Sequence, residues 1–183
     1  MKIMQKYFLA IVPTGEIQQA ATALKLELKA KLNVKYALKS PAHITLKMPF
    51  SFNEAKEKLL IEKLSNFLST KKSFRIQVGG TGTFGKRVIF WKIRADSQLA
   101  ELQADLKNFC KKELNLVDEL SDRNYHPHMT IAFKDVKERD FDQVKALIQQ
   151  SDIEQPMSVC AVHLLKRIDG NWVVIDSLKM VSE

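Results

Sequence analysis

The sequence predicts a mixed fold of helices and strands in which one strand–helix–strand unit occurs twice. In several segments apolar residues recur at spacings of three and four, which is typical of amphipathic helices. Short runs rich in Val, Ile and Phe lie between these segments and are typical of strands. In two parts of the chain an apolar run, a helical segment and a run containing His-x-Thr follow in the same order, as a duplicated lobe would.

The parts of the two units can be assigned in chain order. In the first unit the strand, helix and His-x-Thr run are residues 7–12, 17–32 and 43–46, and in the second they are residues 88–93, 98–114 and 128–131. Asn53 and Asp140 are placed to cap two further helices. Asp169 and Gly170 separate two strand-like runs and predict a closing hairpin.

The glycine-rich segment GGTGTFGK, residues 79–86, is compatible with two interpretations. It resembles a phosphate-binding loop, but that pattern requires Ser or Thr after the lysine and a helix to follow. Here Lys86 is followed by Arg87 and a strand-like run. We therefore expect a mobile loop between two strands.

The composition is that of an ordinary globular protein, with 45% hydrophobic and 27% charged residues. The length of 183 residues fits one compact domain or two tightly joined lobes. With the repeated unit we expect a single domain, residues 1–183, made of two intertwined lobes. No segment approaches the roughly 18 apolar residues of a membrane helix, so we expect a cytoplasmic protein without a membrane partner. The net charge of +8 favours anionic partners, although lysines on helix surfaces account for much of it. Cys110 and Cys160 lack metal-type spacing and are expected to be reduced thiols.

The two His-x-Thr segments combine residue types that suit chemistry on a phosphodiester. In a strand, residues i and i+2 share a face about 6.5–7 Å apart, so His43 accompanies Thr45 and His128 accompanies Thr130. A neutral imidazole can take a proton from an attacking oxygen, and a protonated one can give a proton to a leaving oxygen. The threonine hydroxyls can donate hydrogen bonds to phosphate oxygens. If the two strands lie side by side, these four side chains line one cleft, and the chemistry needs no metal.

With these motifs the chain resembles the two-histidine (2H) phosphoesterase superfamily, and within it the 2′-5′ RNA ligase-like proteins. The mark of the family is a pair of H-h-[T/S]-h motifs, where h is apolar, and HITL at 43–46 and HMTI at 128–131 both match it. The similarity extends to the strand and leucine-patterned helix before the second motif, residues 87–93 and 99–109, and to the closing hairpin at 159–180. The resemblance implies a bilobal α+β fold, with antiparallel sheets related by pseudo-two-fold symmetry and flanking helices around a central cleft.

The resemblance also implies a function. It predicts a metal-independent phosphoesterase that acts on 2′,3′-cyclic phosphate ends of RNA or nucleotides, and on 2′-5′ linkages, with ligation as the reverse reaction. By this resemblance His43 and His128 are the acid/base pair, and Thr45 and Thr130 bind phosphate. Which histidine is the base stays open. No cofactor or metal is implied, the expected partners are RNA ends or small nucleotides, and a monomer is expected.

Two other functions are compatible with the sequence. A binding module could use the same cleft to hold RNA ends or a nucleotide without turning them over. A metal-dependent hydrolase could be built on His126 and His128, although zinc sites need three or four ligands and no further Cys/His cluster is present in the sequence. We expect a loop role for His126.

Several further residues have less specific signals. Lys47 continues the His43–Thr45 face and could stabilise phosphate charge or extend into solvent. His163 lies in the closing hairpin, where a structural role is expected. Trp91, Phe50 and Phe84 could stack on a base, but core packing is the stronger expectation for each.

Overall fold

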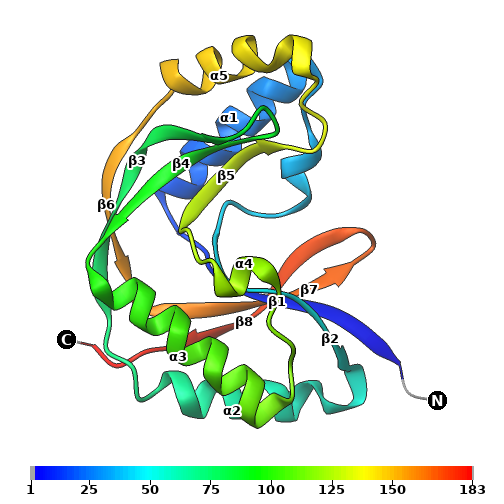
Figure 1. The fold of residues 1–183 in the computed structure, drawn as a ribbon, viewed down its shortest axis with the longest axis vertical. Coiled ribbons are helices and arrows are strands. Elements are labelled where there is room, and N and C mark those ends of the chain that lie inside the picture. The colour runs from blue at the N-terminus through cyan, green and yellow to red at the C-terminus, as the bar shows by residue number, and fades with distance from the viewer. Residues whose placement is uncertain (1–2, 183) are drawn as a thin grey trace.

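The computed structural model describes residues 3–182 and contains one curled sheet of eight strands with helices packed against it (Figure 1). The strands are β1 (Met4–Ile11), β2 (Ile44–Asn53), β3 (Phe74–Phe84), β4 (Val88–Ala95), β5 (His128–Phe133), β6 (Glu154–Val159), β7 (Ala161–Ile168) and β8 (Asn171–Lys179). Their order is β6-β3-β4-β5-β2-β1-β7-β8, and each neighbouring pair is antiparallel. The predicted α+β fold with antiparallel strands and flanking helices is confirmed.

The strand order has internal symmetry. The first half-sheet, β6-β3-β4-β5, and the second, β2-β1-β7-β8, meet at the pairing of β5 with β2. Reading outward from this junction, β5 corresponds to β2 and β4 corresponds to β1, as the repeated units predict. The two halves expected from the sequence are therefore parts of one continuous sheet.

The helices cross between the halves. They are α1 (Glu16–Leu32), α2 (Glu57–Leu68), α3 (Ser97–Leu114), the short α4 (Leu120–Arg123) and α5 (Phe141–Gln150), with single 3-10 turns η1 (Tyr36–Lys39), η2 (Glu54–Lys56) and η3 (Glu138–Asp140). Helix α1 follows β1 but packs against β5 and α5, whereas α3 follows β4 but packs against β2 (Figure 1). Within residues 3–182 no helix is both long and apolar enough to cross a membrane.

The two crossing helices end in the same way. Asn33 after α1 and Asn115 after α3 adopt left-handed φ values of 54° and 52°, which asparagine tolerates better than most residues. The next residue, Val34 or Leu116, is buried and donates its N–H to a carbonyl oxygen of the helix end, at 3.3 and 3.1 Å. The sequences LNV and LNL at these ends therefore carry the duplication beyond the His-x-Thr motifs.

Both motif strands contain a β-bulge directly after the threonine. Leu46 in β2 and Ile131 in β5 have no partner in the neighbouring strand, and the ladder shifts by one residue there. A bulge turns the residue that follows it to the other face of the strand. As a result Lys47 and Ala132 both point into the core and are 0% exposed.

The glycine-rich segment, residues 79–86, is mostly strand, so the expectation of a mobile loop was wrong for residues 79–84, whereas Gly85 and Lys86 lie in the turn between β3 and β4. Strand β3 continues through it to Phe84, with a bulge at Gly79–Gly80. Glycine in a strand marks a bulge or a close approach, and both occur here. A Cβ atom on Gly82 would lie 2.4 Å from Cε2 of Phe90, so the missing side chain makes room for this ring.

We predict that Gly82→Ala lowers the free energy of unfolding by about 1–3 kcal/mol, the usual cost of overpacking a filled site. The reason is that Phe90 is only 3% exposed, so its ring has little space to move away. Urea unfolding of the variant measures the loss. The double variant Gly82→Ala/Phe90→Leu should lose less than the sum of the two single variants, and full additivity would contradict this explanation.

Candidate active site

The two His-x-Thr motifs meet where the half-sheets join. Strands β2 and β5 pair in register at Ile44 and Met129, which are both 0% exposed and belong to the core beneath the helices. In an antiparallel pair this register places His43 across from Thr130 and Thr45 across from His128. Side chains alternate along a strand, so these four lie on the face opposite to Ile44 and Met129. The structure thus brings together the four residues that the sequence had selected.

The pairing also fixes the arrangement of the four side chains. The two histidines occupy one diagonal of the group and the two threonines occupy the other. Diagonal neighbours in an antiparallel pair are about 7–8 Å apart, a separation that leaves room for a small group between the two rings. The hydroxyls of Thr45 and Thr130 make no hydrogen bond to any other part of residues 3–182, so both are available to a ligand.

Both imidazoles are oriented by the same contact. Nδ1 of His43 lies 2.7 Å from the carbonyl oxygen of Pro41, and Nδ1 of His128 lies 2.7 Å from that of His126. A carbonyl oxygen only accepts, so Nδ1 carries a hydrogen in each ring. In the neutral form Nε2 is therefore the basic nitrogen of both histidines.

Burial lowers the pKa of both histidines. The pKa of His43 falls to about 4, because desolvation and the charges of Lys25 and His128 outweigh the hydrogen bond to Pro41. The pKa of His128 is also lowered, mainly by burial. The hydrogen bond to the His126 carbonyl raises this pKa, and the charge of the His126 ring lowers it further. Both imidazoles are thus neutral at pH 7 without a ligand, and a bound anion would favour their protonated forms.

Aromatic rings support each imidazole. The ring of Phe8 from β1 lies 4.9 Å from that of His43, and the ring of Phe90 from β4 lies 5.1 Å from that of His128. Phe84 adds an edge contact to His128 at 4.9 Å. Strands β1 and β4 correspond in the repeat, so the two halves use equivalent strands to hold the two histidines.

The segment before His43 is fixed by two side chains of α1. The buried amine of Lys25 donates to the carbonyl oxygens of Ala37 and Ser40, at 3.0 and 3.2 Å. Burial lowers the pKa of Lys25 to about 8. The amide of Gln18 donates to the carbonyl of Ala42 at 3.0 Å and accepts from its N–H at 2.9 Å. The backbone that carries the first histidine is therefore held from the neighbouring helix.

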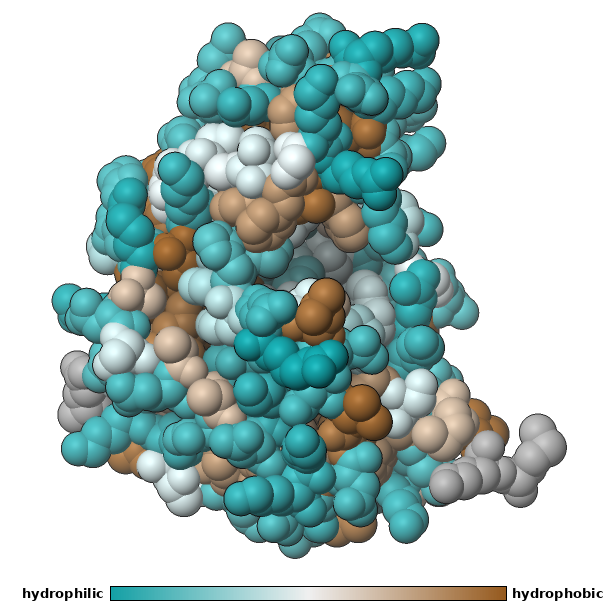
Figure 2. Space-filling view, viewed as in Figure 1, coloured by the Kyte–Doolittle hydropathy of each residue, from teal (hydrophilic) through white to brown (hydrophobic). Residues whose placement is uncertain are grey.

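A pocket of about 190 Å³ opens beside Thr45 and His128. Its other lining residues are Leu46, Met48, Phe84, Ser121, Asp122, Asn124, Tyr125 and His126. The hydroxyl of Tyr125 is buried and has no hydrogen-bond partner within the described part of the chain, and burial raises its pKa. Figure 2 shows that the surface is hollowed between the upper and lower parts of the molecule. The pocket combines neutral polar groups with aromatic edges.

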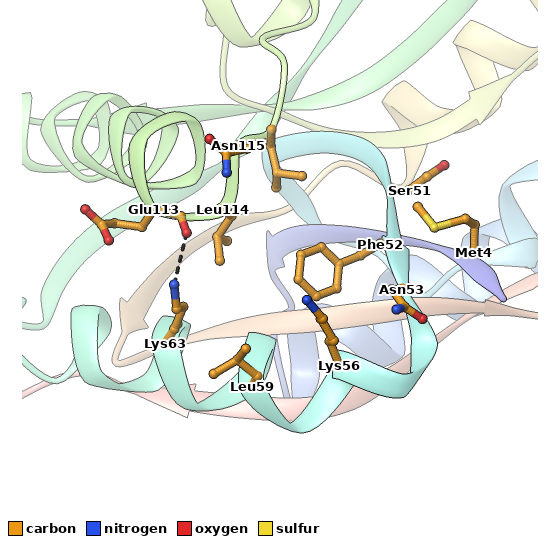
Figure 3. A pocket seen from close by; sticks show the side chains of 11 residues that line it. Met4, Ser51, Phe52, Asn53, Lys56, Leu59, Lys63, Glu113, Leu114 and Asn115 are labelled. Atoms are coloured by element: carbon orange, nitrogen blue, oxygen red, sulfur yellow. Dashed lines mark hydrogen bonds between the residues drawn. The ribbon is translucent and has the colours of Figure 1, made fainter. Parts of the chain in front are cut away.

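A larger pocket lies elsewhere. It measures about 440 Å³ and lies between α2, the end of β2 and the end of α3 (Figure 3). Lys63 crosses it and donates to the carbonyl oxygen of Glu113 at 3.1 Å. No histidine lines this pocket, so it lacks the side chain on which the proton transfers expected from the sequence depend.

Lys47 does not continue the His43–Thr45 face, and this prediction was wrong. The bulge at Leu46 turns Lys47 into the core, where it forms an ion pair with Asp122 and donates to the carbonyl oxygen of Val117 at 2.8 Å. The side chain is thus neither beside the phosphate position nor in solvent. At the corresponding place the second motif has Ala132, which needs no partner.

Asp122 connects the first motif strand to the segment that leads into the second. Its carboxylate accepts the N–H groups of Met48 and Glu119, at 2.8 and 2.9 Å, in addition to the Lys47 amine. Its carbonyl oxygen accepts from Gln103 of α3 at 3.0 Å. Helix α4 was not predicted, because four residues are too few to show a helical period.

The remaining candidates lie in different surroundings. Trp91 and Phe50 are buried in the core, as expected, whereas Phe84 is 38% exposed and borders the pocket. His126 lies in the irregular segment before β5, as its proline neighbour suggested. Nδ1 of His163 accepts the N–H of Val12 at 3.1 Å, which gives this residue a structural contact.

Within residues 3–182 no three His, Cys, Asp or Glu side chains are grouped in a way that could hold a metal ion. The rings of His126 and His128 are 6.4 Å apart and have no third ligand. Cys110 and Cys160 are both unpaired.

The chain is similar to known proteins along nearly its whole length. The sequence profile of the 2′-5′ RNA ligase superfamily matches residues 13–171. A Bacillus mycoides protein is 24% identical over 181 residues, covering 97% of this chain and 98% of that protein. A Bacillus anthracis protein is 26% identical over 180 residues, covering 96% of each. Both relatives carry the provisional name of a phosphoesterase.

Solved structures share the fold. Escherichia coli LigT without ligand superposes with a TM-score of 0.65 at 16% identity, covering 98% of this chain and 99% of LigT. A Thermus thermophilus protein superposes with a TM-score of 0.64 at 16% identity, covering 97% and 99%. At this level of identity the similarity shows the fold alone.

We predict that Lys47→Met lowers the free energy of unfolding by about 3–5 kcal/mol, because it leaves the Asp122 charge buried without a cation. The double variant Lys47→Met/Asp122→Asn removes both charges and keeps an oxygen for the Met48 N–H, so it should be more stable than the single variant. Urea unfolding of the three proteins compares them. Equal stability of Lys47→Met and the unaltered protein would show that the ion pair does not hold this junction.

Proposed function

The chain belongs to the 2′-5′ RNA ligase superfamily, and from this premise we propose that it is a phosphoesterase that opens 2′,3′-cyclic phosphates of RNA ends or nucleotides. The observation that carries the proposal is the pairing of Ile44 with Met129, which puts two imidazoles and two hydroxyls on one face of the sheet. The same site would act on 2′-5′ linkages, and ligation is the reverse of their cleavage.

The proposed reaction needs two proton transfers and no metal. One neutral imidazole takes a proton from water at Nε2 while the water oxygen bonds to phosphorus. The bond from phosphorus to one ribose oxygen breaks, and the other imidazole, protonated at Nε2, gives its proton to that oxygen. The product is a phosphomonoester beside a free hydroxyl. The two imidazoles have then exchanged protonation states, which proton exchange with solvent restores.

The threonines complete the proposed site. Thr45 and Thr130 would donate their hydroxyl hydrogens to the non-bridging phosphate oxygens, whose charge must be stabilised in the transition state. The pocket beside Thr45 and His128 would receive the nucleoside. LigT, which shares the fold, has been solved with 3′-AMP and with phosphate. 3′-AMP is a phosphomonoester beside a free hydroxyl, the kind of product that the proposed reaction forms.

A second candidate function is binding without turnover. The lowered pKa values of both histidines favour it, because an acid that is neutral at pH 7 cannot donate a proton. In that case the cleft would hold an RNA end or nucleotide through the threonines and the pocket. Turnover of a 2′,3′-cyclic nucleotide at any pH decides against this alternative.

We predict that His43→Ala and His128→Ala each lower kcat on a 2′,3′-cyclic nucleotide by about 10²–10⁴-fold, the usual contribution of a general acid or base. Product formation followed by ³¹P NMR measures the loss. His163→Asn, which keeps an acceptor for the Val12 N–H, is the matched control and should retain activity within about threefold. Normal turnover by the His43→Ala protein would exclude the proposed mechanism, and a rate lost on dialysis against EDTA would show that a metal takes part.

The pH dependence of kcat/KM should be bell-shaped, with its maximum on the acid side of neutrality. The base must be neutral and so needs a pH above its pKa, whereas the acid must be protonated and needs a pH below its pKa. The pKa of His43 is about 4 and that of His128 is also lowered, so the window lies between about 4 and the ordinary histidine value of about 6.5. Initial rates from pH 3.5 to 9 test this, and a plateau that extends to pH 9 is the contrary result.

A further inference from the structure

Three cationic side chains from three separate parts of the chain gather around Tyr36 in η1. The amine of Lys39 lies 4.8 Å from the centre of the Tyr36 ring, and that of Lys134 lies 4.5 Å from it. Lys134 also donates to the Tyr36 hydroxyl at 2.9 Å. The pKa of Tyr36 is lowered, first by the hydrogen bond from Lys134 and then by the nearby cations Arg167 of β7 and Lys39. We call Tyr36, Lys39, Lys134 and Arg167 the tyrosine cluster.

The cations of the tyrosine cluster have no carboxylate partners. Within residues 3–182 none of the three forms an ion pair, although several other lysines do. The nearby carboxylate of Asp135 accepts the backbone N–H groups of Lys35 and Tyr36, both at 2.8 Å. Like charges repel, so a group of unpaired cations is an arrangement that an anion would stabilise.

Lys134 adopts an unfavourable backbone conformation in the tyrosine cluster. Its φ is 65°, a left-handed conformation that Asn and Gly adopt far more readily than lysine. Unfavourable backbone conformations at non-glycine residues are concentrated at functional sites. The choice of lysine at this position therefore points to a use for its side chain.

The tyrosine cluster lies on the same side of the sheet as the His-x-Thr motifs. The bulge at Ile131 places Phe133 on the face of Thr130, and Tyr36 packs against Phe133 with ring centres 5.1 Å apart. Three residues of strand correspond to about 10 Å, so Phe133, against which the tyrosine cluster packs, lies about 10 Å from Thr130, a distance that a nucleotide chain held at the site can span.

A second chain of contacts leads from the tyrosine cluster to the first histidine. The guanidinium of Arg167 lies 5.5 Å from the ring of Trp172, Trp172 packs against Phe8 at 4.8 Å, and Phe8 packs against His43 at 4.9 Å. Contacts between side chains therefore connect the tyrosine cluster to both His43 and the strand that carries Thr130.

The two sides of the site differ in charge. The pocket beside His128 is lined by neutral polar residues such as Ser121, Asn124 and Tyr125, and its only carboxylate, Asp122, is engaged with Lys47. The side of His43 carries the unpaired cations. In a 2′,3′-cyclic RNA end the base leaves the terminal ribose at C1′ and the phosphodiester chain leaves it through the 5′ oxygen on the other side of the ring. A base in the neutral pocket and a chain phosphate toward the cations would match this difference.

We propose that the tyrosine cluster binds a phosphodiester of the nucleotide chain on the 5′ side of the terminal ribose, so that the substrate is an oligoribonucleotide end rather than a free mononucleotide. This inference rests on the proposed function. The ligand chemistry is a phosphate monoanion within a nucleotide chain, contacted by two amines, a guanidinium and a tyrosine hydroxyl.

The test compares a trinucleotide ending in a 2′,3′-cyclic phosphate with the corresponding 2′,3′-cyclic mononucleotide. The triple variant Lys39→Gln/Lys134→Asn/Arg167→Gln removes the cations, and asparagine suits the left-handed backbone at residue 134. The control Lys29→Gln/Lys112→Gln/Lys179→Gln removes the same charge from exposed, unpaired lysines elsewhere. Thermal unfolding of both variants checks that the fold is retained.

We expect the ratio of kcat/KM for the trinucleotide to that for the mononucleotide to fall at least tenfold in the triple variant and less than twofold in the control. The slope of log(kcat/KM) against log[salt] for the trinucleotide should flatten by about 0.7, as for the loss of one phosphate contact on a single strand. An unchanged ratio, or an equal fall in the control, would overturn the proposal.

A failure of the proposed function can be distinguished from a failure of this subsite. If the unaltered protein turns over neither substrate, equilibrium binding of a 3′-phosphorylated trinucleotide is measured by fluorescence anisotropy. Binding weakened at least tenfold in the triple variant but not in the control would support the subsite alone, and equal binding by all three proteins would overturn it.

Discussion

The pairing of β2 with β5 is the constraint on which the site depends. The two half-sheets are in register at Ile44 and Met129, whose side chains fill the core beneath the helices. Because side chains alternate along a strand, burying these two apolar residues forces their polar neighbours to the opposite face. A slip of one strand by one residue would turn its histidine and threonine toward the core and its apolar residues toward the cleft. The packing of the core and the composition of the site are therefore fixed by the same register.

Much of this arrangement could be predicted from the sequence because it depends on local periodicity. The alternation in HITL and HMTI placed each histidine beside its threonine, and the leucine spacing located α1 and α3. The relation between the two motifs required the repeat, since the sequence alone does not give the register between distant strands. The family resemblance supplied the antiparallel arrangement and the roles assigned to the four residues.

The wrong predictions lie at β-bulges, where one residue without a partner changes the face to which the following side chains point. A bulge at Leu46 moved Lys47 from the expected face into the core, and a bulge at Gly79–Gly80 let β3 pass through a segment that resembles a loop. Alternation cannot reveal a bulge, because the residue without a partner looks like any other apolar residue. The tyrosine cluster escaped prediction for a different reason, since its members come from three distant parts of the chain and carry no shared pattern.

The crossing of α1 and α3 has a mechanical consequence. Each helix follows a strand of one half-sheet in the chain and packs against the other half-sheet. The two halves are therefore held together on the side of the sheet that the helices cover. Spreading them would expose the buried faces of both helices. A ligand would thus meet a rigid opening of nearly constant width, and discrimination between substrates would come from the shape and charge of its walls instead of from a closing movement.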